Sequence, residues 1–223
     1  RKVNCQFGPA SVAFTFQGHG GLIDLNLAPK DLLIIGFGAL GSETADASRL
    51  AEAVVRFRAT GTGQPNDHPE YVRGGYKHAA FETVSELGDF EGISGKTSSE
   101  FQELFTVHNG TGTIYSDLAS DRLQLAIKML PESQAYFVVQ GTAPSTAVSI
   151  HAEVSSPVRP THQVAAVARG TKTEVGYVFL SPMKVETISE SKLGGGTSVD
   201  CRQFFSEPML AAIRAPAELP QTE

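Results

Sequence analysis

The chain has 223 residues, of which 41% are hydrophobic and 19% are charged, and its formal net charge is −6. This evenly spread, apolar composition indicates a folded protein and excludes a disordered chain. The negative charge argues against a face built to bind nucleic-acid phosphates, and no apolar run approaches the ~20 residues of a membrane-spanning helix.

The N-terminal part of the chain predicts strands joined by one short helix. Val12, Phe14 and Phe16 alternate with small or polar neighbours, which is the pattern of a half-buried strand. Residues 32–37 form a continuous apolar run, which predicts a buried strand. A helix is predicted over residues 42–53, because apolar residues recur there at helical spacing.

The remainder of the chain carries further strand signals. Residues 73–113 are interrupted by glycines and are predicted to be irregular. Short turns around Pro131 and Pro144 suit antiparallel neighbours. No internal repeat is evident. Alternating apolar residues predict strands over residues 54–58, 123–127, 136–139, 148–154, 175–180 and 184–188.

These elements predict an all-β fold, a jelly-roll β-sandwich with one or two short helices in its connections. The jelly-roll domain is expected to cover residues 1–190. Residues 191–223 are expected to form a C-terminal extension with a short helix and a mobile Pro-rich tail. One shared core is expected for Val12, Phe14, Phe16, Leu123, Leu125, Ile127, Val148 and Ile150.

The two cysteines, Cys5 and Cys201, lie near opposite ends of the chain and share no metal-ligand spacing. The sequence therefore indicates neither a zinc site nor a disulfide framework, and leaves their redox state open. The chain begins Arg1-Lys2 with neither an initiator methionine nor an apolar leader, which suggests a processed or truncated N-terminus.

A GxGxxG motif at Gly36, Gly38 and Gly41 is the sharpest apparent signature of a binding site. It follows a predicted strand and opens a predicted helix, as dinucleotide-binding folds require. The acidic residue expected about 20 positions later, at the end of the next strand, is missing, since the predicted strand that ends at Arg58 is followed by no acid until Asp67. Glycines at an ordinary turn are therefore the favoured interpretation, and an NAD(P)-dependent oxidoreductase that uses Gly36–Gly41 is an alternative.

The acidic residues Glu82, Glu86, Asp89 and Glu91 cluster in the part of the chain predicted to be irregular. Their carboxylates could bind calcium at a surface or a subunit contact, although a solvated acidic loop is the simpler interpretation. The sequence contains neither a catalytic serine motif nor paired histidines at metal-ligand spacing. A protein that is not an enzyme and has no resident cofactor is therefore expected.

Residues 122–160 carry a family resemblance. A Pro-containing turn precedes a strand that ends at Gly141, and a longer strand from Val148 is followed by Pro157. This order resembles the closing strands of jelly-roll coat proteins from small non-enveloped positive-strand RNA viruses, of the nodavirus and tombusvirus kind. Upstream, residues 25–29 and 48–58 are similar to the helix and strand that follow the second strand of that fold.

The resemblance implies a capsid protein that assembles with itself into an icosahedral shell around an RNA genome. It implies contact with genomic RNA through an N-terminal arm that is absent from this chain, no membrane span, and a location in the virion after assembly in the host cytoplasm. Calcium bound by the acidic cluster at subunit contacts would be compatible with such a shell. A carbohydrate- or protein-binding β-sandwich module is a further alternative, because the same strand pattern would give it.

Overall fold

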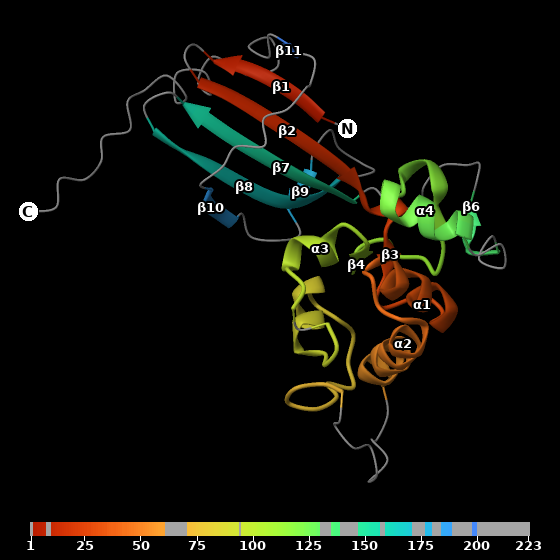
Figure 1. Cartoon of the computed structure of the whole chain (residues 1–223). Coiled ribbons are helices and arrows are strands. Elements are labelled where there is room, and N and C mark those ends of the chain that lie inside the picture. Colours follow the sequence, from red (N-terminus) through yellow and green to blue (C-terminus); the bar gives the residue numbers. More distant parts are fainter. Residues whose placement is uncertain are drawn as a thin grey trace, which may run out of the picture. The chain divides into compact units, whose positions relative to one another are not determined.

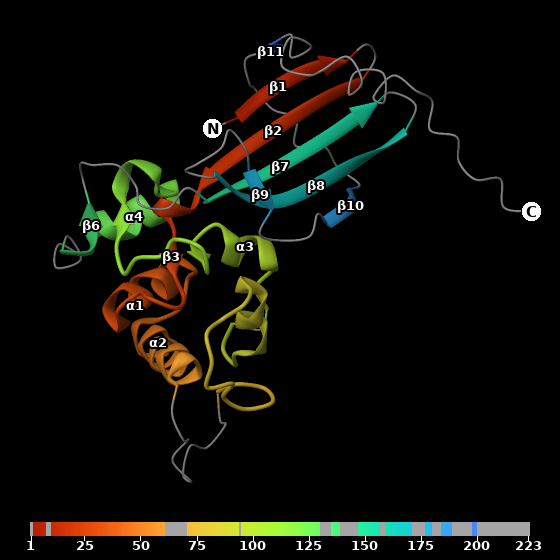
Figure 2. The same ribbon diagram turned by 180° about the vertical axis from the view of Figure 1, so that it is seen from behind.

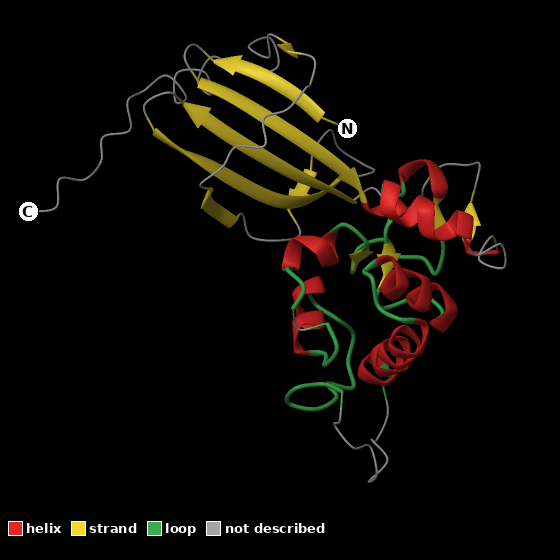
Figure 3. Cartoon of the chain, in the orientation of Figure 1, coloured by secondary structure: helices red, strands yellow, loops and turns green. Residues whose placement is uncertain are grey.

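The computed structural model describes residues 2–7, 10–60, 71–93, 95–129, 135–138, 147–156, 159–170, 177–179, 184–188 and 198–199. The chain divides into two compact units. One joins Arg1–Gln17 to Ser149–Glu223, and the other is Gly18–Val148. Figures 1 and 3 show that the first unit is a sheet and that the second contains the helices.

The sheet unit contains one sheet whose strands run in the order β10-β8-β7-β2-β1-β11, with β9 paired to β8. Strands β1 and β2 are antiparallel, and β1 and β11 are parallel. The strands are β1 (Lys2–Phe7), β2 (Ala10–Gly18), β7 (Ala147–Ser156), β8 (Arg159–Gly170), β9 (Tyr177–Phe179), β10 (Lys184–Ile188) and β11 (Ser198–Val199).

One face of the central strands is apolar. The hydroxyls of Ser11 and Ser155 are hydrogen-bonded at 2.7 Å, so these residues of β2 and β7 share a face. Alternation then places Phe14 and Phe16 on the opposite face, together with Ile150. The two phenylalanine rings stack with centroids 6.3 Å apart, and Phe16 is 36% exposed.

Cys5 lies on β1, is buried, and is disulfide-bonded. The sequence spacing had not indicated a disulfide, because two cysteines so far apart give no local signature. The other cysteine of the chain, Cys201, lies outside the described residues.

The helical unit, Gly18–Val148, packs its helices around a core rich in phenylalanine. Helices α1 and α2 lie side by side (Figure 2). Its elements are η1 (His19–Gly21), β3 (Ile23–Asp24), α1 (Lys30–Ala39), α2 (Thr44–Arg58), η2 (Val84–Asp89), α3 (Ser98–Gln102), β4 (Phe105–Thr106), β5 (Ile114–Tyr115), η3 (Ser116–Leu118), α4 (Asp121–Met129) and β6 (Phe137–Val138).

The expectation of an all-β jelly-roll sandwich is wrong, because the fold mixes helices with one larger sheet and two short parallel strand pairs. The apolar run over residues 32–37 lies in α1, and residues 54–58 extend α2. Residues 123–127 lie in α4, where Leu123 is fully buried and Leu125 is 62% exposed. The single core expected for residues of the sheet and of α4 is therefore also wrong.

The boundary expected at residue 190 is not tested by this division into units. Residues 189–197 and 200–223 lie outside the described part of the chain, so the short helix and the tail expected within residues 191–223 are not tested either.

The helical unit contains an internal repeat that sequence inspection did not find. A short strand, a turn and a helix occur twice: β3 leads to α1, and β5 leads to α4. The equivalent residues Ile23 and Ile114 are both buried, and each strand pairs in parallel with a later one, β3 with β4 and β5 with β6. Further buried equivalents are Ala28 with Ala119 and Leu32 with Leu123.

The two repeats pack on each other reciprocally. A Cβ added at Gly21 would lie 2.1 Å from the carbonyl oxygen of Leu118. A Cβ added at the equivalent Gly112 would lie 3.0 Å from the carbonyl oxygen of Leu27, the equivalent of Leu118. Such reciprocal contacts are typical of segments related by an approximate two-fold axis, and glycine permits the close approach in both.

The GxGxxG motif does not form a strand-to-helix turn, because Gly36 and Gly38 lie inside α1. Gly41 follows the helix with φ +93, and its N–H donates to Gly38 O while the Ser42 N–H donates to Phe37 O. This pair of bonds is a Schellman ending, for which a glycine at positive φ is suited. The local structure that dinucleotide binding requires is therefore absent, and the oxidoreductase alternative loses its site.

Candidate functional site

Glu82 and Glu86, two of the four proposed calcium ligands, form ion pairs with Lys77. The Lys77 Nζ lies 3.1 Å from Glu82 Oε1 and 3.2 Å from Glu86 Oε2, and both carboxylates raise the pKa of Lys77. Glu86 Oε1 also accepts the N–H groups of Glu82 and Thr83, which caps the start of η2. These contacts satisfy the two carboxylates locally and give them a structural role.

The other two proposed ligands lie on a backbone bridge. The Arg73 N–H donates to Asp89 O, and the Glu91 N–H donates to Tyr71 O. The described residues contain no group of three or more His, Cys, Asp or Glu side chains placed to hold one metal ion. The structure thus brings Glu82 and Glu86 together through Lys77, and calcium binding by the four acids stays a prediction.

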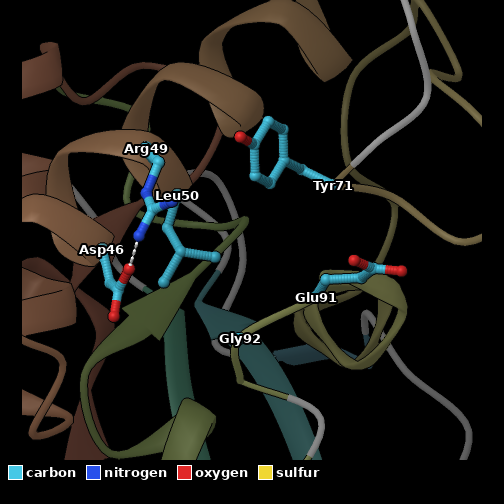
Figure 4. Close-up of a pocket in the computed structure, with 6 residues that line it drawn as sticks. All are labelled: Asp46, Arg49, Leu50, Tyr71, Glu91 and Gly92. Carbon is cyan, nitrogen blue, oxygen red and sulfur yellow. Dashed lines mark hydrogen bonds and ion pairs between the residues drawn. The ribbon is translucent and has the colours of Figure 1, made fainter.

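A pocket of about 210 Å³ opens beside α2, lined by Asp46, Arg49, Leu50, Tyr71, Glu91 and Gly92 (Figure 4). Arg49 forms an ion pair with Asp46 and contacts the Tyr71 hydroxyl, and these contacts raise its pKa. Sequence reasoning identified Glu91 as a candidate residue but missed Arg49 and Tyr71, because their proximity depends on how α2 packs against the bridge.

The chemistry of this pocket is limited to polar recognition. The side chains of Asp46 and Arg49 are about half exposed, so solvent screens their charges. Its lining residues include neither a serine, threonine or cysteine nucleophile nor a histidine to act as its base. The pocket could contact a polar group of another molecule, but its geometry supplies no catalytic step.

A buried polar cluster organises the turn between β3 and α1. Asp24 is buried, and its carboxylate accepts the N–H groups of Asn26 and Gly110, both at 2.8 Å. Arg58 donates to the carbonyl oxygens of Leu25 and Ala28, each at 2.6 Å. Burial lowers the pKa of Arg58, and the nearby Asp24 charge opposes that change.

Two amide side chains extend this cluster to other segments. The Asn26 side chain donates to Phe81 O and accepts the Phe81 N–H, so it pairs with both backbone groups of one residue. The buried Asn109 donates to the carbonyl oxygens of Leu22 and Thr113, which are equivalent positions in the two repeats. All of these bonds fix loops to the repeats, and we interpret the cluster as structural.

Within the described residues, none of the helices has the length and apolar character needed to cross a lipid bilayer.

The chain matches no protein-family model, and no curated protein matches it. Among solved structures it is similar to a chain in the crystal structure of the GspK-GspI-GspJ complex from the type 2 secretion system of enterotoxigenic Escherichia coli. The TM-score is 0.55 at 11% identity, and the match covers 83% of this chain and 83% of that chain. At this identity the likeness shows a shared fold alone.

The expectations of a viral coat protein, an icosahedral shell and a virion location are therefore wrong. The resemblance to coat proteins rested on reading residues 122–160 as successive strands, and its first part is helix α4. The fold that this chain shares is instead that of a chain from the GspK-GspI-GspJ complex.

Proposed function

We propose that this chain is a non-enzymatic structural subunit of a multiprotein assembly related to the type 2 secretion apparatus, and that its partners are other proteins of that assembly. The observation that carries the proposal is the fold likeness to a chain of the GspK-GspI-GspJ complex, because it covers more than four fifths of both chains. A match over a single small motif would not support a shared architecture in this way.

The way the two units are joined supports a role in protein contacts. The helical unit lies between β2 and β7, which are neighbours in the sheet, so the insertion leaves the strand order of the sheet intact. An insertion between adjacent strands adds surface without replacing the core, and such additions commonly carry binding functions. The lack of a nucleophile and base around the described pocket is consistent with a structural role.

A deletion experiment in the source organism tests the proposal. Removing the gene should retain normally exported proteins inside the cell, and a plasmid copy of the gene should restore export, measured by mass spectrometry of the culture medium. In parallel, cross-linking of a tagged chain in living cells should recover components of a secretion apparatus. Unchanged export together with cross-links only to unrelated proteins would overturn the proposal.

A further inference from the structure

The pocket beside α2 is bordered by two segments that meet across a backbone bridge. Val72 and Phe90 are the bridged pair, and both are buried. The Glu91 N–H donates to Tyr71 O at 2.8 Å, so these two residues also lie opposite each other. Because successive side chains of extended backbone alternate in direction, Tyr71 and Glu91 lie on the side away from Val72 and Phe90, where they line the pocket.

The lining of the pocket offers an apolar wall, an aromatic ring and free space. Leu50 on α2 is 3% exposed and supplies the apolar wall. Tyr71 is partly buried, and its ring extends toward Arg49 on α2 (Figure 4). Gly92 has φ +89, and a Cβ added there would meet nothing within 4 Å, so space remains next to Glu91.

The ionisable groups of the lining leave one carboxylate available to a ligand. The Arg49 guanidinium is already paired with Asp46 and contacts the Tyr71 hydroxyl. Glu91 is exposed, and the ion pairs and side-chain hydrogen bonds of the described residues do not include its carboxylate. The lining thus carries two carboxylates and one guanidinium, so it favours a cation over an anion.

The charges around the pocket also favour a cation. Arg73 and Asp89 lie opposite each other at the next position of the bridge, where their charges offset each other. Over the whole helical unit, acidic residues outnumber basic ones. The field of such a surface attracts basic groups of a partner and repels acidic ones.

The pocket has room for a single side chain. Its volume of about 210 Å³ lies below the range of about 300 to 1,000 Å³ that is typical of small-molecule sites. Arginine suits it best among cationic side chains, because a guanidinium binds a carboxylate through two parallel hydrogen bonds and stacks on an aromatic ring. We propose that the pocket receives an arginine side chain of a partner protein, with the Glu91 carboxylate as acceptor and the Tyr71 ring beside it. This inference rests on the proposed function, since it supposes a protein partner.

A capped glycyl-arginyl-glycine tripeptide tests the pocket on the full chain. It should shift the backbone amide NMR signals of Glu91 and Gly92 in a saturable way, with a Kd in the millimolar range that rises with salt concentration. The citrulline counterpart has nearly the same shape without the charge, and it should bind at least about threefold more weakly. The corresponding glutamate peptide should cause no saturable shift.

Three variants identify the groups that bind the peptide. Glu91→Gln keeps the backbone bond to Tyr71 but removes the charge, so it should weaken the arginine peptide at least about threefold and remove most of its advantage over citrulline. Tyr71→Leu should weaken it about two- to fivefold through loss of the ring. Asp117→Asn removes an exposed carboxylate in η3 and should leave binding unchanged.

Any of three results would overturn the arginine site: no saturable shift at Glu91 and Gly92, equal binding of the arginine and citrulline peptides, or equal binding by the wild type and Glu91→Gln. The peptide measurements need no secretion apparatus, so they separate the two proposals. Peptide binding as expected, with export unaffected by deletion of the gene, would overturn the proposed function alone. Loss of export on deletion, without peptide binding, would overturn the arginine site alone.

Discussion

The glycines of α1 show how differently one residue type is used within a single motif. A Cβ at Gly36 would lie 2.7 Å from the Phe105 ring and from Ile23 Cδ1, whereas a Cβ at Gly38 would meet nothing within 4 Å. Gly41 is required for its positive φ. The three glycines that resemble a nucleotide fingerprint therefore serve helix packing and helix termination.

Replacing each helical glycine by alanine should have opposite effects. Gly36→Ala should lower the free energy of unfolding by about 1 to 3 kcal/mol, because the added methyl overpacks the core against Phe105. Gly38→Ala should raise it by about 0.5 to 1 kcal/mol, because alanine is the better helix former at an open position. Urea unfolding of the two variants measures both changes, and equal effects would contradict the packing role of Gly36.

The amide of Asn26 gives a second prediction at the level of single residues. Asn26→Asp replaces the amide nitrogen that donates to Phe81 O by an oxygen, so an acceptor would face an acceptor. The variant should lose about 1 to 3 kcal/mol of stability. Asp117→Asn changes the exposed, equivalent position of the second repeat and should change stability by less than about 0.5 kcal/mol. Similar losses in both variants, in thermal unfolding, would argue against this role for Asn26.

The clarity of the hydrophobic periodicity explains which elements of the fold could be predicted from the sequence. The strands β2, β7 and β10 and most of α2 were predicted, because alternation or helical spacing is clear in them. Helix α1 was predicted as a strand because its residues 32–37 are mostly buried and form an unbroken apolar run, which periodicity cannot separate from a buried strand.

The site residues were harder to predict than the elements. The partners of Arg49 and of Asn26 come from loops far along the chain, so their contacts follow from tertiary packing. The internal repeat was missed because the identity between its copies is confined to one short stretch. In that stretch the identical pairs are Gly21 and Gly112, Ile23 and Ile114, Leu27 and Leu118, Ala28 and Ala119, and Leu32 and Leu123. The repeat is detected through burial and reciprocal glycine contacts instead.

Residues 123–127 were predicted as a strand but lie in helix α4, and two substitutions can distinguish these structures. If residues 123–127 were a strand, Leu123 and Leu125 would point to the same face. In α4, Leu123 is fully buried and Leu125 is 62% exposed. Leu123→Asp should therefore unfold the helical unit, since an unpaired buried charge costs several kcal/mol. Leu125→Asp should leave the circular dichroism spectrum and the melting temperature nearly unchanged, and comparable damage from both substitutions would contradict the helix.

At the scale of the whole molecule, the chain combines a sheet formed by both ends of the sequence with a helical unit inserted between neighbouring strands. Most of the excess negative charge lies in the helical unit, because acidic residues clearly outnumber basic ones between Gly18 and Val148. The two units therefore differ in charge as well as in secondary structure, and their stabilities should respond differently to pH and to salt.

His151 of β7 should make the stability of the sheet unit sensitive to acid. It is half-buried on the same face as Ser155, and burial lowers its pKa from the ordinary value of 6.5. Between that value and the lowered pKa of the folded state, the unfolded chain binds the proton and the folded chain does not, so acidification favours unfolding. The stabilisation is complete above pH 6.5 and is lost progressively as the pH falls below it. In the wild type, the protection of β7 and β8 amides should decrease over this window. His151→Gln should abolish most of that decrease and His78→Asn none of it, whereas an unchanged pH profile in His151→Gln would show that another group of the sheet unit titrates instead.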